Sequence, residues 1–257
     1  MSNALDARQG IAPKVFFAFT NPRPGQEDDF ELWYSRHLKD ITDVDGFLWG
    51  ERLVADPDQR PGQIIQWRYA AIYGFEGDTN EIHRRLREAD AGWGDIPGQD
   101  ALHPEYNAWV YDRYQPLVVN ESRVPDGNLD LAGGLGEHLF IVFTNPTPGR
   151  EREFEEWYDE HLQAVTDVDG FVWGERLIAD PDQRPGQATR WKYVALYGFD
   201  GDVVDIHERL RVLGESQASF AVTDAVHPAY VAWVYSSHQP LILHEDAAGT
   251  GTGGVES

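Results

Sequence analysis

The chain has 257 residues, of which 44 are acidic and 21 basic, so its formal net charge at pH 7 is -23. A surface of this sign repels phosphate backbones and anionic lipid, which argues against binding to nucleic acid or to a membrane surface. Hydrophobic residues make up 41% and cysteine is absent, so a packed core is expected without disulfides, thiolate nucleophiles or cysteine metal ligands.

The first residues, MSNALDARQG, lack the basic and apolar segments of a signal peptide, and we expect residues 1–13 to form an N-terminal extension. No run of about 18 apolar residues follows, so no transmembrane helix is expected. These features predict a soluble, cytoplasmic protein.

Residues 14–117 predict strand, helix, two strands, helix and strand. KVFFAFT at 14–20 is rich in β-branched and aromatic residues, as in a strand. A helix follows, with an apolar stripe at Phe30, Trp33, His37 and Ile41. Two strands (FLWGERLVAD and IIQWRYAAIYGFEG, joined by PDQRPGQ), a helix beginning after Asp78, and a last strand (YNAWVYD) complete the unit.

The same pattern recurs in the second half of the chain. Residues 16–116 align without a gap to residues 140–240, and 58 of the 101 positions are identical. This identity predicts a duplicated domain, with repeats at 14–117 and 138–244, a polar linker at 118–137 and a disordered tail at 245–257.

The element order describes a ferredoxin-like α+β unit, whose sheet has one face covered by helices and one face bare. Two such units bury their bare faces by packing sheet to sheet. The fold class expected is therefore α+β, with two βαββαβ repeats forming an intrachain pseudo-dimer, the dimeric α+β barrel. Further homodimerisation stays open.

The segment NPRPGQEDDFELWYSRHLKDITDVDGF resembles the start of the EthD-like families of the dimeric α+β barrel superfamily. These families show an Asn-Pro or similar turn after the first strand, a helix with two aromatic residues and then His, and a turn into the second strand. The resemblance covers both repeats and implies a small-molecule pocket between sheet and helices. It places the motif histidine on His37 and His161.

The resemblance does not select one chemistry, because related proteins include cyclases, isomerases, dehydratases, cofactor-free monooxygenases and haem proteins. His37 and His161 are candidate general bases and acids, because an imidazole exchanges protons near neutral pH. The aromatic residues beside them would hold a flat substrate: Trp33, Tyr34, Trp157 and Tyr158. The alternative is a histidine hydrogen-bonded near the end of a helix.

The third strand of each repeat carries an unchanged alternation, with Trp67 and Tyr69 recurring as Trp191 and Tyr193. Strand periodicity places alternate residues on one face, so we expect this face to line the pocket or to pack in the core. Tyr69 and Tyr193 are candidate oxyanion donors, and Trp67 and Trp191 candidate stacking residues.

Three further pairs of charged or titratable residues recur. Arg52 and Arg176 could bind a carbonyl or anionic substrate, or could form an ion pair on the sheet. His103 and His227, each before a proline, are candidates for the pocket mouth. His83 and His207 read as half-buried helix residues. No histidine spacing matches a metal motif, so neither metal nor cofactor is expected, with haem left open.

The leading functional hypothesis is a cofactor-independent lyase or isomerase acting on a small hydrophobic, aromatic or polyketide-like carbonyl compound. The alternatives are a cofactor-free aromatic monooxygenase and a non-catalytic small-molecule-binding protein. The repeats diverge most at 88–99 against 212–223, which share no identity, so we expect either that the two pockets differ or that one is vestigial.

Overall fold

Both repeats fold into the predicted order of elements in the computed structural model, which describes residues 4–6, 10–93, 97–130, 134–217 and 220–244. The elements of the first repeat are β2 (Lys14–Thr20), α1 (Glu27–Thr42), β3 (Phe47–Ala55), β4 (Tyr69–Phe75), α2 (Thr79–Trp93), η2 (Gln99–Ala101) and β5 (Asn107–Arg113). Those of the second are β8 (His138–Thr144), α3 (Glu151–Thr166), β9 (Phe171–Ala179), β10 (Tyr193–Phe199), α4 (Val203–Ser216) and β11 (Val231–Leu243). The expected linker at 118–137 contains β6 (Val118–Val119) and β7 (Asn128–Asp130), and β7 pairs with β1 (Ala4–Asp6). The expected tail at 245–257 lies outside the described residues.

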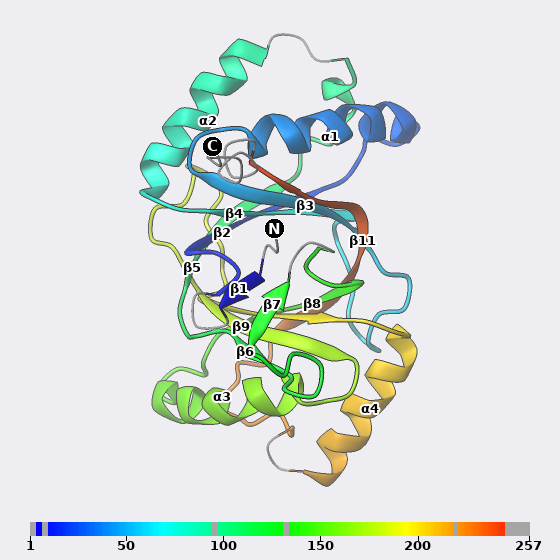
Figure 1. Ribbon diagram of the computed structural model, residues 1–257, viewed down its shortest axis with the longest axis vertical. Helices are drawn as coiled ribbons and strands as arrows, with labels where there is room; N and C mark the ends of the chain where they lie inside the picture. Colours follow the sequence, from blue (N-terminus) through cyan, green and yellow to red (C-terminus); the bar gives the residue numbers. More distant parts are fainter. Residues whose placement is uncertain (1–3, 7–9, 94–96, 131–133, 218–219, 245–257) are drawn as a thin grey trace, which may run out of the picture.

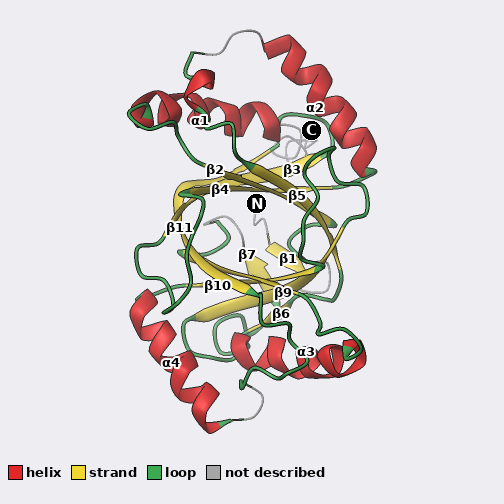
Figure 2. Ribbon diagram, turned by 180° about the vertical axis from the view of Figure 1, so that it is seen from behind, coloured by secondary structure: helices red, strands yellow, loops and turns green. Residues whose placement is uncertain are grey.

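The strands form one closed antiparallel barrel. Each repeat contributes four neighbouring strands, in the order β5-β2-β4-β3 and β11-β8-β10-β9. β11 then pairs with β3, and β5 with β9, so the two sets close on each other as eight strands with β6 beside β9. Helices α1 and α2 cover one outer side of the barrel and α3 and α4 the opposite side (Figure 1, Figure 2).

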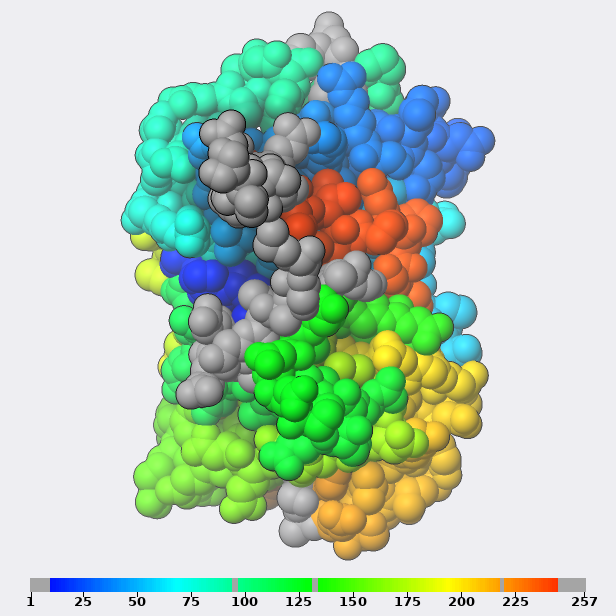
Figure 3. Space-filling view, viewed as in Figure 1, coloured from blue at the N-terminus to red at the C-terminus, as the bar shows by residue number. Residues whose placement is uncertain are grey.

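The last strand of each repeat makes the closure, because it continues past its own repeat onto the other. β11 pairs with β8 through Val231–Ser236 and then with β3, from Tyr235 opposite Ala55 to Leu243 opposite Trp49. Figure 3 shows the orange-red residues of this strand lying against the blue half of the molecule. β5 and β6 make the reciprocal pairing with β9.

The loop PDQRPGQ, expected only to join two strands, also holds the repeats together. The Gln59 side-chain amide donates to the Val234 carbonyl at 2.8 Å and accepts from the Val234 amide at 3.0 Å. Gln183 makes the same two bonds to Val110, at 2.6 and 3.0 Å. The glutamine side chains thus bond to backbone N–H and C=O groups at a strand edge that has no neighbouring strand. This shared role is consistent with the identical sequence of the loop in the two copies.

The barrel interior is packed with aromatic side chains and forms the central core. Phe19 and Phe143 lie at its centre, surrounded by four tryptophans: Trp67, Trp109, Trp191 and Trp233. The prediction that Trp67 shares a face with Tyr69 is wrong, because β4 begins only at Tyr69 and the chain before it turns inward. From Tyr69 onward the alternation holds, and Tyr69 faces the helices.

Two buried glutamates from the repeated WGER segment secure the ends of the barrel. Glu51 accepts hydrogen bonds from the Leu135 amide at 2.8 Å and the Ser237 hydroxyl at 3.0 Å. Glu175 accepts from the Ile11 amide at 2.9 Å, while Trp49 donates to the Ile11 carbonyl at 3.0 Å. Burial raises the pKa of Glu51 to about 7 and that of Glu175 to about 8. The segments before β2 and β8 are therefore anchored inside the barrel by both repeats.

These raised pKa values predict that stability depends on pH. A carboxyl group with a raised folded-state pKa contributes stability at low pH that is lost as the pH rises, here from about 4.5 towards 7 for Glu51. The Glu51→Gln variant keeps a neutral group of the same shape, so it should gain about 1–3 kcal/mol relative to wild type between pH 5 and pH 8. Urea unfolding at both pH values measures this gain, with the exposed Glu88→Gln as control. Parallel pH dependences of wild type and Glu51→Gln would contradict the assignment.

Candidate functional site

The first repeat holds a cavity of about 240 Å³ between its two helices and the outer face of its sheet. α1 supplies Trp33, Tyr34 and His37, and α2 supplies Arg87 and Trp93. The three residues of α1 share one side of that helix because side chains three and four apart on a helix lie above one another. The sheet and its flanking segments complete the lining with Phe16, Ala18, Thr20, Gln99, Leu102, Tyr106 and Ala108.

His37 lies in an aromatic wall of this cavity. Its ring stacks on Trp33 with centroids 4.5 Å apart and an interplanar angle of 19°. Tyr34 and Trp93 meet it edge-on, at 5.7 and 5.5 Å. The Nδ1 atom is buried without a hydrogen-bond partner among the described residues. Burial lowers the pKa of His37 to about 4, so the imidazole is neutral at pH 7.

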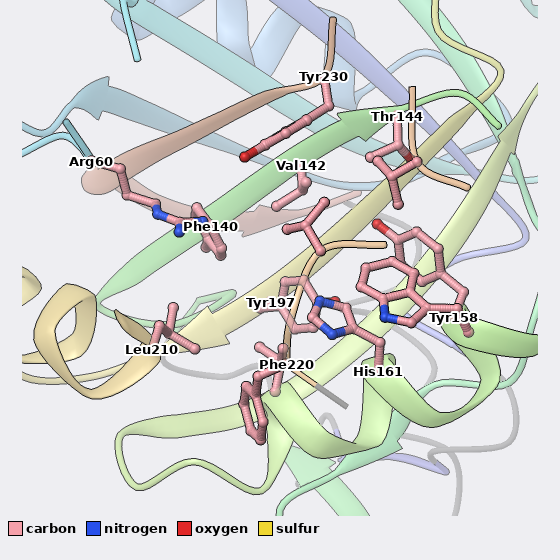
Figure 4. A pocket seen from close by; sticks show the side chains of 14 residues that line it. Arg60, Phe140, Val142, Thr144, Tyr158, His161, Tyr197, Leu210, Phe220 and Tyr230 are labelled. Atoms are coloured by element: carbon pink, nitrogen blue, oxygen red, sulfur yellow. The ribbon is translucent and has the colours of Figure 1, made fainter. Parts of the chain in front are cut away.

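The second repeat has a cavity at the equivalent place, but its volume is only about 70 Å³. Figure 4 shows His161 and Tyr158 from α3 beside Tyr197 from the sheet, and the Phe220 ring lies edge-on to the imidazole with centroids 6.4 Å apart. Here too the histidine stacks on a tryptophan, with the Trp157 and His161 centroids 4.0 Å apart. An engineered cavity of about 150 Å³ is known to bind benzene. The first cavity exceeds that size and the second does not reach half of it.

The segments that differ most between the repeats account for this asymmetry. Phe220 and Val222 line the second cavity, and the Trp157 indole donates to the Ala221 carbonyl at 3.2 Å. In the part of the first repeat that the structure describes, the buried Trp33 indole nitrogen has no acceptor. The first pocket therefore keeps both space and unused polar groups, and the expectation that the two pockets differ is confirmed.

Each cavity also receives an arginine from the other repeat. Arg184, in the second copy of PDQRPGQ, lines the first cavity, and Arg60 lines the second. The glutamine contacts that hold this loop to β5 place Arg184 at the first pocket. Neither site is complete within one repeat.

Tyr69 and Tyr193 do not line either cavity, so the predicted arrangement of His37 facing Tyr69 is wrong. Tyr69 instead packs against Arg52, whose guanidinium carbon lies 4.4 Å from the Tyr69 ring centroid and 4.5 Å from that of Tyr34. Its charge is paired with Glu31 of α1, at 2.7 Å. Arg176 repeats this, paired with Glu155 at 2.6 Å and stacked on Tyr158 and Tyr193.

Arg52 and Arg176 are therefore not at the pocket, and their ion pairs join strand to helix. The alternative prediction, an ion pair, agrees with the structure in its chemistry, but the acidic partners lie on helices and not on the sheet. Because each guanidinium is buried, an anionic partner and aromatic faces are what make its burial tolerable. Burial acts to raise the pKa of Glu31, but hydrogen bonds with Arg52, Tyr69 and His238 together lower it to about 2.

The remaining predicted substrate-binding residues lie elsewhere. Trp67 and Trp191 belong to the barrel interior. His103 and His227 do not line the cavities; each accepts a hydrogen bond at Nδ1 from the backbone amide two residues later, at 3.1 Å. The His-Pro sequence thus shapes the turn that enters the last strand.

Sequence reasoning missed several lining residues of the first cavity: Thr20, Arg87, Trp93, Tyr106 and Arg184. The divergence of 88–99 was a usable signal for Trp93, which lies in that segment. Arg184 carried no signal, because its position depends on contacts between the repeats.

No group of three or more histidines and acidic residues that could hold a metal occurs in the described ranges. Within those ranges, no helix has the length and apolar character needed to cross a membrane.

Comparisons with known proteins support the fold. The chain matches no family model, and no curated protein resembles it significantly in sequence. Among solved structures, an anthrone oxidase-like protein aligns with a TM-score of 0.61 at 12% identity, over 97% of this chain and 100% of that one. A suspected monooxygenase of Fusobacterium nucleatum aligns with a TM-score of 0.50 at 10% identity, over 91% of this chain and 98% of that one. A chlorite dismutase variant of Candidatus Nitrospira defluvii aligns with a TM-score of 0.51 at 11% identity, over 87% of this chain and 90% of that one. The chain thus has the fold of the dimeric α+β barrel proteins.

The ion pair between Arg52 and Glu31 predicts a specific stability loss. In Glu31→Gln the buried guanidinium loses its counter-charge, so the free energy of unfolding should fall by about 2–3 kcal/mol, less than for a fully buried pair because Glu31 is one-third exposed. Denaturant unfolding measures the change. Glu81→Gln, which breaks only exposed ion pairs, serves as control and should have little effect. Equal stability of the two variants would contradict a structural role for Arg52.

Proposed function

We propose that the chain is a cofactor-independent lyase or isomerase that acts on a small aromatic carbonyl compound in the first-repeat pocket. The observation that carries this proposal is the neutral, half-buried His37 imidazole in the wall of a cavity of about 240 Å³, stacked on Trp33. A flat substrate suits the aromatic walls, and an imidazole at its edge suits proton transfer.

In the proposed reaction, His37 removes a proton from the carbon next to the carbonyl group. The electron pair of the broken C–H bond forms a C=C bond, and the carbonyl oxygen becomes an enolate. A base whose conjugate acid has a pKa near 4 is weak, so the C–H bond must already be acidic or the enolate must be well stabilised.

Two donors in the pocket suit stabilisation of the enolate oxygen. The Trp33 indole N–H is buried without an acceptor among the described residues. Burial raises the pKa of Tyr34, so its hydroxyl keeps its proton, and to donate to a substrate it would have to rearrange its hydrogen bonds with Tyr73 and Thr20. These groups take the role first predicted for Tyr69 and Tyr193. Return of the proton to a different carbon gives isomerisation, and loss of a leaving group from the β-carbon gives elimination.

A second candidate is cofactor-free oxygenation of the same carbanion, favoured by the likeness in fold to an anthrone oxidase-like protein and a suspected monooxygenase. The carbanion would reduce O₂ and combine with it, and protonation would give a hydroperoxide. Loss of water would then leave a carbonyl group, so one oxygen atom enters the product and the other leaves as water. A porphyrin is larger than the described cavity, so we propose no haem chemistry.

We also propose that the chain belongs to the EthD-like families and arose by tandem duplication of a ferredoxin-like unit. The gapless identity of the repeats and the equal strand order of the two halves support the duplication. The position of His37, after two aromatic residues on α1, supports the family assignment.

Deuterium exchange tests the catalytic proposal without knowledge of the natural substrate. Wild type should accelerate exchange at the acidic carbon of indanone in D₂O, followed by proton NMR. His37→Gln should slow the enzymatic exchange about 100-fold or more. His161→Gln is the matched control and should stay within about twofold of wild type, because its cavity is too small for the substrate.

Wild-type exchange in His37→Gln would contradict the role of His37, and a wild type that binds indanone without exchange would support a binding protein instead. Oxygen uptake during the reaction, measured with an electrode, would favour the oxygenase over the isomerase.

A further inference from the structure

Two arginines at the first cavity have no acidic partner. Arg87 projects from α2 and Arg184 from the loop of the second repeat, and both line the cavity. Within the described chain, neither guanidinium forms an ion pair or a side-chain hydrogen bond. Acidic residues outnumber basic ones by 44 to 21, so acidic partners are not scarce in this chain.

The two repeats differ in the acidic residues that surround Arg87 and its counterpart in the second repeat. Its counterpart, Arg211, pairs with Glu208 at 2.7 Å and with Glu215 at 2.6 Å and does not line the second cavity. In the first repeat the positions of those two glutamates are occupied by Arg84 and Ala91. Arg87 therefore loses both acidic neighbours and remains available to the pocket.

Arg184 is held in place by the loop that clamps the two repeats. Gln183 on one side bonds to Val110, and Gln187 on the other accepts from the Ala108 amide at 2.8 Å. Ala108 itself lines the cavity, so the arginine is fixed beside the pocket wall. A loop anchored in this way presents its guanidinium at little further entropic cost.

The charges around the cavity favour an anion. The lining contains two guanidinium groups and one carboxylate, that of the exposed Asp90. Burial lowers the pKa of the buried His83, and Arg184 and Arg87 lower it further, while Asp180 and Asp182 act against them. The pocket is thus locally cationic in a chain whose net charge is -23, and that contrast attracts an anionic ligand.

We propose that the substrate of the first pocket is an aromatic compound that carries a carboxylate, and that Arg87 and Arg184 bind this group at the pocket mouth. The ring would lie among Trp33, Trp93 and His37, while the two guanidiniums grip the carboxylate oxygens. This inference rests on the proposed function in its choice of pocket. It adds the substrate class and makes the site depend on both repeats.

Binding measurements test the inference separately from catalysis. Isothermal titration calorimetry would compare naphthoate with naphthamide, which has the same shape without the charge. Wild type should bind naphthoate at least about tenfold more tightly, as charge-assisted hydrogen bonds to arginine imply. Arg87→Gln/Arg184→Gln should lose this preference while binding naphthamide as before.

Arg211→Gln is the matched control, because it changes the counterpart arginine outside both pockets, and it should keep the wild-type preference. His37→Gln should also keep it, so a failed catalytic proposal would remain distinguishable from a failed anion site. Equal or absent affinity for the two probes in wild type, or an unchanged preference in Arg87→Gln/Arg184→Gln, would overturn the inference.

Discussion

The remaining structure depends on one constraint: the last strand of each repeat pairs first within its own repeat and then with the other. An open four-stranded sheet would leave an apolar face and unpaired edges exposed to water. β11 extends from its own sheet to pair with β3, the edge strand of the first repeat, and β5 likewise pairs with β9. Where these strands have no neighbour, the Gln59 and Gln183 side-chain amides bond to their backbone. Closure buries the aromatic interior, and it also carries Arg184 from one repeat to the pocket of the other.

Two segments that are identical in the repeats, WGER and PDQRPGQ, contribute to this closure. The glutamate of WGER anchors the segment before the first strand of the opposite repeat, the tryptophan anchors that of its own, and the arginine ties strand to helix. The PDQRPGQ loop serves the same interface. Residues that differ between the copies, by contrast, set the size and charge of the two pockets. His37 and Trp33 are shared between the copies, so the difference between the two pockets comes from the residues around them.

Part of this could be predicted from the sequence. The periodicities predicted the element order and placed His37 and Trp33 on one face of a helix, because both depend on local spacing. The roles of Tyr69 and Arg52 were not predictable, since the helix position of Glu31 relative to β3 is a tertiary fact. Trp67 was misplaced because the start of β4 shifted the inward and outward alternation before Tyr69. Arg184 reaches the pocket through contacts between residues more than 70 positions apart.

The central claim is that the first-repeat pocket, and not the second, is the working site. The most direct measurement is a proton–nitrogen NMR titration of the tryptophan indoles with naphthoate, with Trp33 and Trp157 assigned by Trp→Phe variants. Ligand entry would give the Trp33 indole N–H a new neighbour, whereas the Trp157 N–H is already bonded to Ala221. The account predicts a saturable shift of the Trp33 signal with the Trp157 signal unmoved. A shift at Trp157 alone, or equal shifts at both, would contradict it.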